Sequence, residues 1–459
     1  MMQFTQSAPP PAPLLHHNGG GHGLGLDLAE PDQPLLYSQR CAARPPWTGR
    51  SAVAFPTSSR ALGSFNTAGC MEQLLVHCAN AIDGNDATLA QQILWVLNNI
   101  APPDGDSNQR LTSAFLRALV ARASATGSCK ILASPPAPAR HHQFSALDLA
   151  NFVDLTPWHR FGYTASNAAI LDAVEGSSVV HIVDLGTTHC MQIPTLIDAL
   201  ASRPEGPPVL RLTVPSATAN SPPPMLDISY DELGSRLVNF ARSRNIPMEF
   251  QVVHSSPSDG FSALIDQLRV QQLVSEGGEA LVVNCQMLLH YIPDETAGAI
   301  ATPPVSLRSM FLKAVRSLEP ALVTVADEDA DFTATDVVSR LRSAFNYLWI
   351  PYDAVDTFLP KGSEQRKWYE AGLGWRIEDV IAREGLQRVE RLEQRGRWAQ
   401  RMRGAGFRGV AFGEEAAAEV KGMLDEHAAG WGMKREEDGD LVLTWKGHNV
   451  VFATAWVPS

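Results

Sequence analysis

The middle of the chain alternates between short β-branched runs and segments with helical periodicity, and this alternation constrains the fold more than any other feature. The first run, 179–183, reads Val-Val-His-Ile-Val, and the following segment, 193–201, has apolar residues at helical spacing. Further runs and helical segments alternate at 209–214, 230–243, 248–253, 261–270, 280–285, 307–318 and 321–326. Strands that alternate with helices of this length predict βαβ units and a parallel sheet with right-handed crossovers.

The two ends of the folded region depart from this alternation. Residues 71–150 begin with apolar residues at helical spacing, which predicts a helical cap. Near the end, the runs 441–445 and 450–457 flank the short segment 446–449 and predict an antiparallel hairpin. The predicted fold class is therefore α/β: a Rossmann-like, methyltransferase-type doubly wound sheet with an N-terminal helical cap and a C-terminal antiparallel hairpin.

The first 70 residues differ in composition from the rest. They contain nine prolines and a Gly/His tract at 19–25, and their large apolar residues are scattered. Such a segment cannot bury enough apolar surface to offset the entropy of ordering, so we expect residues 1–70 to be disordered. The predicted folded domain is 71–459, with the helical cap at 71–150 and the Rossmann-like core at 151–459.

Charge and cysteine content narrow the classes of function. The formal net charge is 37 − 49 = −12, which argues against a protein that binds polyanions over its whole surface. The six cysteines form no C-x-x-C pair and no disulfide framework, as is typical of a reducing compartment. The sequence has no run of 18 apolar residues and no secretory signal at its start, so we expect a soluble intracellular protein.

The loop after the first strand indicates whether a nucleotide-type cofactor is expected. A dinucleotide or S-adenosylmethionine loop needs several glycines, so that its backbone can approach the ligand. The loop 184–191 contains only Gly186, and the bulky residues His189, Cys190 and Met191 stand where small ones are needed. We therefore expect no cofactor, no metal and no catalytic residue. A methyltransferase-like enzyme that uses S-adenosylmethionine is the disfavoured alternative.

Three other features near the strands suggest chemistry, and each has a structural interpretation. His181 lies inside an apolar run and is interpreted as a core histidine. The Asp184 carboxylate, at the end of that run, is expected to accept backbone N–H groups of the following turn. The acidic loop 327–331 would suit a divalent cation, but a solvated loop in which Asp331 or Thr333 caps a helix is the favoured interpretation.

One stretch of the chain is basic although the net charge of the whole chain is negative. Residues 383–408 contain eight arginines and three glutamates, a local balance of +5. A helix here would place arginines on one face, whereas a strand at 386–392 would not. Contact with phosphate and pairing with acidic residues of the same chain remain equally open. The candidate phosphate-contacting residues are Arg388, Arg391, Arg395, Arg397 and Arg401.

Five blocks in order along the chain resemble the motifs of the plant-specific GRAS family of transcription regulators. They are the start of the first leucine-rich region at 71–82, the VHIID block at 180–184 with Gln192 and Pro194, the second leucine-rich region at 281–285 with 289–290, the PFYRE block at 342–353 and 375–378, and the SAW block at 431–432, 445 and 455–456. The run 154–163 and the loop 188–192 narrow the resemblance to the Scarecrow-like branch. The chain departs from the family at Cys190 and Ile193, where Gly and Trp are usual.

The resemblance implies a nuclear transcription factor or coregulator that controls RNA polymerase II transcription in development. The implied partners are other GRAS proteins or zinc-finger transcription factors, in homo- or heterodimers. Sequence-specific DNA binding is a second mode, and no membrane contact is implied. The candidate partner-interface residues are Leu74, Leu75, Leu89 and Leu97. The family-motif positions with structural roles are His181, Asp184, Gln192, Pro194, Asn284, Trp431, Trp445 and Trp456.

Overall fold

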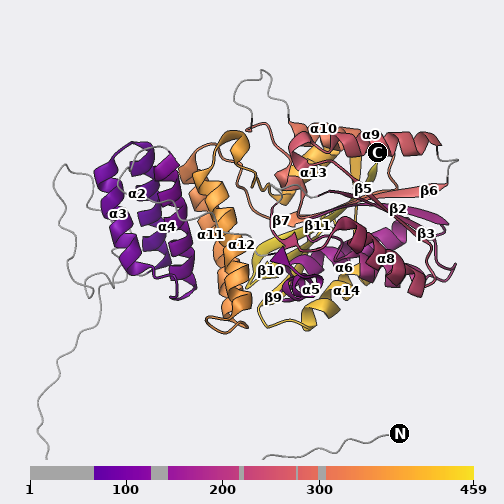
Figure 1. Ribbon diagram of the computed structural model, residues 1–459, viewed down its shortest axis with the longest axis horizontal. Coiled ribbons are helices and arrows are strands. Elements are labelled where there is room, and N and C mark those ends of the chain that lie inside the picture. The colour runs from indigo at the N-terminus through magenta and orange to yellow at the C-terminus, as the bar shows by residue number, and fades with distance from the viewer. Residues whose placement is uncertain (1–66, 126–142, 217–221, 275–277, 298–305) are drawn as a thin grey trace, which may run out of the picture. The chain divides into compact units, whose positions relative to one another are not determined.

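The computed structural model describes residues 67–125, 143–216, 222–274, 278–297 and 306–459 (Figure 1). The expectation of disorder at 1–66 lies outside these residues. Helix α2 (Ala68–Asp83) begins inside the segment that was expected to be disordered. The Thr67 side chain caps it by accepting a hydrogen bond from the Cys70 N–H, 3.3 Å away. Regular structure in the described chain therefore begins three residues before Met71.

In the described residues, nine strands form one mixed sheet (Figure 1). Across the sheet the order is β5 (Met248–Val253), β3 (Val209–Pro215), β2 (Val179–Gly186), β6 (Glu279–Gln286), β7 (Leu322–Glu328), β11 (His448–Pro458), β10 (Leu441–Trp445) and β9 (Trp431–Arg435), and β8 (Phe407–Val410) also pairs with β11. The first five strands are parallel, and β11 runs antiparallel to β7, β8 and β10. The predicted Rossmann-like sheet and its C-terminal antiparallel pair are confirmed.

Helices cover both faces of this sheet (Figure 1). On one side lie α9 (Ser262–Val274), α10 (Leu307–Arg316) and α13 (Arg395–Gly404). On the other side lie α5 (Ala146–Asp154), α6 (Pro157–Ala173), α8 (Tyr230–Ser243) and α14 (Glu414–Asp425). Helix α7 (Ile193–Ala201) follows β2, and β1 (Gln143–Phe144) pairs with β4 (Met225–Leu226) in a separate two-stranded sheet. No described helix is long and apolar enough to cross a lipid bilayer.

The cap is built from two distant parts of the chain. Helices α2, α3 (Ala87–Ile100) and α4 (Ser107–Ala125) pack with α11 (Val337–Asp356) and α12 (Glu364–Ala382). Arg110 of α4 joins them through ion pairs with Asp356, at 2.8 Å, and Glu370, at 2.9 Å. The predicted cap, 71–150, therefore does not include α11 and α12. These helices lie more than 200 residues after α4, and a contact between such distant segments leaves no pattern in the local sequence.

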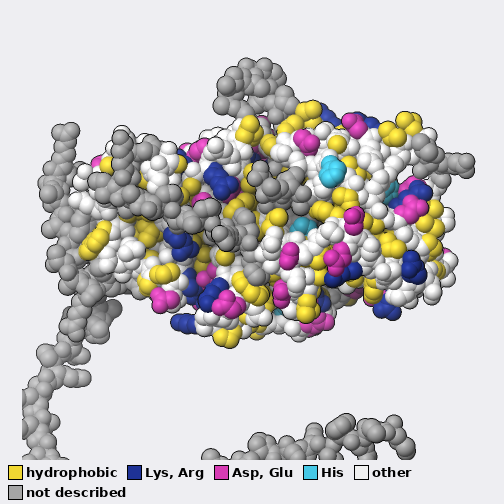
Figure 2. Space-filling view, viewed as in Figure 1, with side chains coloured by type: hydrophobic (Ala, Val, Ile, Leu, Met, Phe, Trp, Pro, Cys, Tyr) yellow, Lys and Arg dark blue, Asp and Glu magenta, His cyan; other side chains and the backbone are white. Residues whose placement is uncertain are grey.

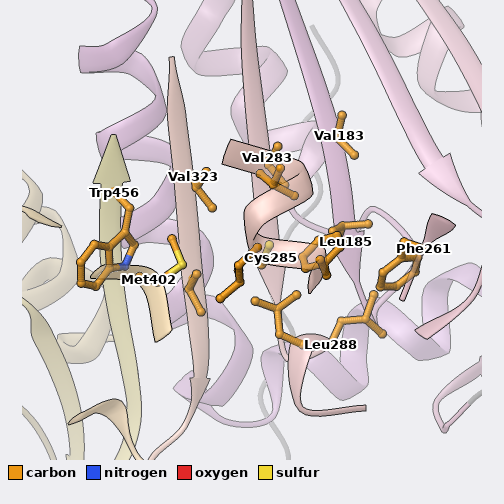
Figure 3. Close-up of a cluster of buried hydrophobic side chains, with 14 of the residues drawn as sticks. Val183, Leu185, Phe261, Val283, Cys285, Leu288, Val323, Met402 and Trp456 are labelled. Carbon is orange, nitrogen blue, oxygen red and sulfur yellow. The ribbon is translucent and has the colours of Figure 1, made fainter. Parts of the chain in front are cut away.

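One side of the sheet forms a continuous apolar core (Figure 3). Val183 and Leu185 of β2 lie beside Val283 of β6 and Val323 of β7, and Trp456 of β11 extends the same cluster. Helices α9, α10 and α13 close it from outside. Strands that are buried on both faces read as continuous apolar runs, and this is why the sequence predicted them well.

Candidate functional site

A buried network of polar side chains occupies the carboxyl ends of the two central strands. The Asn284 side-chain amide donates to Asp184 Oδ1, at 2.8 Å, and to Gln192 Oε1, at 2.9 Å. Gln192 in turn donates to Asn167 Oδ1, and Thr324 donates to Asn284 Oδ1. The network joins β2, β6 and β7 to α6 and to the start of α7. Three of the family-motif residues thus satisfy one another in the interior.

The partner of Asp184 differs from the expectation. Its carboxylate accepts from the Asn284 side chain rather than from the backbone of the following turn. Burial raises the pKa of Asp184 to about 6, although the bonds from Asn284 and Cys190 oppose that rise. Sequence reasoning missed this pairing because Asn284 lies 100 residues further along the chain.

The loop after β2 carries bulky side chains, and Gly186, Thr187 and His189 border a surface hollow of about 430 Å³ beside the end of β3. His189 and Cys190 both adopt positive φ angles, 49° and 64°, and Cys190 is buried beside Asp184. The hydroxyl of Thr188 contacts that of Tyr163, and His189 Nε2 lies 3.1 Å from the Pro224 carbonyl oxygen. The neighbouring strand β3 ends in Pro215, without the acidic residue that holds the ribose in a dinucleotide site. These residues do not fit an adenosyl-type cofactor.

His181 and Pro194 have structural surroundings. His181 is buried in β2, where Nε2 lies 2.8 Å from Thr213 Oγ1 and Nδ1 lies 2.9 Å from Glu279. The interpretation as a core histidine is therefore confirmed. Pro194 lies in the first turn of α7, where a missing N–H costs no helical hydrogen bond.

The three motif tryptophans anchor the end of the chain. Trp445 is fully buried, and its Nε1 donates to Asp353 Oδ2 at 2.7 Å. Its ring lies 4.7 Å from that of Trp431, measured between centroids. Trp456 donates to Thr454 Oγ1 at 2.8 Å. Each buried indole N–H of Trp445 and Trp456 thus has an acceptor, as packing in a core requires.

The acidic loop after β7 makes internal hydrogen bonds. Asp331 accepts from the backbone and the side chain of Thr333, and Asp329 accepts from the Arg395 N–H. The cap of α11 is Asp336, not Asp331 or Thr333 as expected. Within the described ranges, no group of three His, Cys, Asp or Glu side chains is suited to hold a metal ion.

The first part of the basic stretch, 385–394, is neither the helix nor the strand that were considered, and the helix α13 begins only at Arg395. A short 3-10 turn, Gly385–Gln387, leads into an irregular segment before α13. Arg388 is 3% exposed and donates to the Phe332 carbonyl oxygen, and Arg391 is 1% exposed and donates to Asp294 Oδ1 at 3.0 Å. Burial, together with the nearby Arg391, lowers the pKa of Arg388 to about 10. Neither guanidinium faces solvent, so the structure contradicts phosphate contact for these two residues.

The remaining three candidates lie on or beside α13. Arg395 donates to Asp438 and Asp440, and Arg401 donates to Glu393 and Glu295. Arg397 has the most exposed side chain of the five, at 43%, with Glu295 3.2 Å away. Pairing within the chain is therefore the larger role of this stretch. The acidic partners were invisible to local sequence reading, because most of them lie 43 to 106 residues away.

The predicted partner-interface leucines are mostly inside the cap. Leu74, Leu75 and Leu97 are buried, and Leu89 is half-buried, because they form the contact between the cap helices. Among the described residues of the cap, the large hydrophobic side chain that is exposed is Trp95 of α3, at 53%. Helical periodicity could have predicted this exposure, because Trp95 lies on the opposite face of α3 from the buried apolar residues.

Comparison with known proteins agrees with the motif blocks. The model of the GRAS domain family matches residues 71–457. The chain belongs to the GRAS family. It is 60% identical to Scarecrow-like protein 32 of Arabidopsis thaliana over 409 residues, which is 88% of this chain and 97% of that protein. The resemblance of 154–163 and 188–192 to the Scarecrow-like protein 32 type is thereby confirmed.

Two further GRAS relatives bear on function and fold. Scarecrow-like transcription factor PAT1 of Arabidopsis thaliana is 31% identical, over 83% of this chain and 75% of that protein. The crystal structure of SCL7 from Oryza sativa superposes with a TM-score of 0.68 at 24% identity, covering 84% of this chain and 99% of that one. The first relative supports a role in plant transcription regulation, and the second shows the fold.

Proposed function

We propose that this GRAS protein regulates RNA polymerase II transcription in the plant nucleus by binding other regulatory proteins through the outer face of its cap. The observation that carries the proposal is the surface of α3. The helix contains no charged residue, and its exposed side carries Thr88, Gln92 and Asn99 around Trp95. Interface centres are depleted of charge and enriched in tryptophan, so this surface suits a protein partner.

The partners we propose are a second copy of this chain, another GRAS protein or a zinc-finger transcription factor. The acidic total of −12 favours recruitment to DNA by such a partner over general DNA binding. On the part of the face described in Figure 2, basic and acidic side chains are interspersed and form no continuous basic stripe. The glycine-poor loop after β2 disfavours the alternative of a methyltransferase.

The test compares full-length wild-type protein with the Trp95→Ala variant. Each is titrated against a second copy of itself and against purified GRAS and zinc-finger transcription factors. We expect at least one partner to bind, and Trp95→Ala to weaken that complex by about tenfold or more. Leu147→Ala, at an exposed position of α5, is the matched control and is expected to leave binding unchanged. A strict monomer that binds none of these proteins would contradict the proposal.

Direct DNA contact is a second mode that a specific surface favours. Lys313 of α10 and Arg397 and Gln400 of α13 line a surface hollow of about 310 Å³. Glu295 also lies there and neutralises part of its charge. We propose that DNA phosphates contact this hollow once a protein partner has placed the domain on DNA.

A further inference from the structure

A cavity of about 120 Å³ lies where helix α12 covers the carboxyl ends of the parallel strands. Its wall is formed by residues of β1, α5, α6, the loop after β6 and one face of α12, and it is completed by Thr187, residues 223–224 and Glu328 at the end of β7. It is separate from the α3 surface and from the hollow beside α13. An engineered protein cavity of roughly 150 Å³ holds one benzene molecule, so this cavity has room for one small chemical group.

Aromatic side chains dominate the wall. Phe144 and Trp368 lie 6.0 Å apart between ring centroids with an interplanar angle of 81°. Phe152 and Tyr369 lie 5.6 Å apart at 41°. Trp158 and Tyr291 complete the set of rings around the cavity. The six rings come from β1, α5, α6, α12 and the segment after β6, so they line the cavity from several elements. Sites that recognise alkylated ammonium groups are likewise lined by several aromatic rings.

Glu328 and Arg376 line the cavity and belong to one ion-paired cluster, whose third member, Glu390, is not itself a lining residue. Arg376 donates to Glu328 Oε1 at 2.8 Å and to Glu328 Oε2 at 2.6 Å, and it also donates to Glu390 Oε1 at 2.8 Å. Trp158 Nε1 donates to the same Glu328 at 2.9 Å. Two carboxylates therefore face one guanidinium, which leaves a charge of −1. Among the described residues, Glu390 Oε2 is buried without a hydrogen-bond partner.

The two histidines beside the cavity do not cancel this charge. His290 Nδ1 lies 2.8 Å from Asp327 Oδ1, so this pair adds zero charge when the imidazole is protonated and −1 when it is neutral. Burial lowers the pKa of His159 to about 4, so His159 is neutral at pH 7. The charged groups that line the cavity, taken with their direct partners, are therefore net negative in either state of His290.

We infer that this cavity binds a small alkylated ammonium group, of the trimethylammonium class. The aromatic rings of the wall attract a cation, and so does the net negative charge of the lining groups taken together with Glu390 and Asp327. Both oxygens of Glu328 already accept hydrogen bonds, which leaves them poorly placed for a primary ammonium that needs several acceptors. An alkylated ammonium needs none. An anionic ligand is disfavoured, because Arg376, the guanidinium in the wall, is already shared between two carboxylates.

The test titrates the full-length protein with choline and measures binding by ligand-observed NMR or calorimetry. The neutral carbon isostere of choline, 3,3-dimethyl-1-butanol, has the same shape without the charge. We expect saturable binding of choline and of tetramethylammonium, with the isostere weaker by about fivefold or more. Equal binding of choline and its isostere, or no binding of either cation, would overturn the inference. This comparison uses only the wild-type protein, so it does not depend on whether any variant folds.

Variants then locate the site. Trp368 is half-buried, so Trp368→Ala is expected to fold and to weaken choline by about fivefold or more, whereas Trp368→Phe keeps most of the affinity. Trp95→Ala, on the far helix α3, is the control that leaves choline binding unchanged. Unchanged choline binding in Trp368→Ala would place the ligand elsewhere and overturn the assignment.

A trimethylammonium group has two sources, a free metabolite and a trimethylated lysine of a protein. Peptides that differ only in trimethylation of one lysine separate them. Trimethyl-specific peptide binding tighter than choline would support a modified protein as the source, and choline binding without peptide binding would support a free molecule. Both outcomes agree with the inference, and they leave the proposed partner surface on α3 untouched.

Discussion

The Asn284 side-chain amide lies 2.8 Å from the Asp184 carboxylate and joins the two central strands of the sheet at their carboxyl ends. In a nucleotide-binding sheet this edge is left open for the ligand. Here Asp184, Asn284 and Gln192 satisfy one another at the ends of β2 and β6. The cavity beside the ends of β6 and β7 is lined by aromatic rings from β1, α5, α6, α12 and the segment after β6.

The raised pKa of Asp184 predicts a pH dependence of stability. Its folded pKa of about 6 lies above the ordinary value of 3.8, so its contribution is fully present below about pH 4 and is lost as the pH rises through 6. The Asp184→Asn variant cannot titrate there. We expect the free energy of unfolding of wild type, minus that of the variant, to fall by about 2–3 kcal/mol between pH 4 and pH 7.

Urea denaturation of both proteins at several pH values measures this difference. Other carboxylates titrate in the same window, Asp379 and Asp440 among them, and the subtraction removes their contribution. A difference that stays flat from pH 4 to pH 7 would show that Asp184 is ionised throughout.

The buried pair of Arg391 and Asp294 predicts a stability effect without a DNA effect. Arg391→Met leaves the Asp294 carboxylate buried and unpaired, and we expect a loss of about 3 kcal/mol in the free energy of unfolding. Adding Asp294→Asn should restore part of that loss, because it removes the uncompensated charge. Thermal and urea unfolding of the single and double variants check both statements.

Exposed basic residues, rather than buried ones, are expected to set any salt dependence of DNA binding. The slope of log K against log salt is negative, and each phosphate contact contributes about 0.9 to its magnitude. Reversing the charge at Lys313, Arg397 and Arg403 should therefore reduce that magnitude by up to about 3 units. Fluorescence anisotropy with duplex DNA, in the presence of a protein partner, gives the slope.

A matched triple variant separates this local effect from net charge. Arg236→Glu, Lys361→Glu and Lys421→Glu change the total by the same amount at exposed positions on other elements. The slope should then stay near the wild-type value. Equal slopes for the two triple variants would remove the argument for the hollow beside α13.

Two neighbours on α3 are expected to separate folding from binding. Leu97→Ala creates a cavity between the cap helices and should cost about 2–5 kcal/mol in the free energy of unfolding. Trp95→Ala removes an exposed side chain and should change that free energy by less than about 0.5 kcal/mol. Calorimetry distinguishes the two, and a large loss of stability in Trp95→Ala would mean that the indole packs on its own chain.

The sequence by itself determined the parallel strands, the C-terminal hairpin and the family. Buried strands are continuous apolar runs such as 179–183, and the motif blocks are local in the chain, so both leave a signal within a few residues. The same local reading assigned His181 to the core correctly.

Only the tertiary structure decided which polar groups meet. Arg391 pairs with Asp294, which lies 97 residues away in the sequence, and Asp184 accepts from Asn284, which lies 100 residues away. Helix α4 packs against α11 and α12, which belong to the other half of the chain. The sign and spacing of charges along a sequence do not reveal such partners, because burial and pairing depend on distances that folding creates. The sequence therefore left phosphate contact and internal pairing equally open for the arginine stretch, whereas in the fold most of these arginines bind carboxylates and carbonyl oxygens of the same chain.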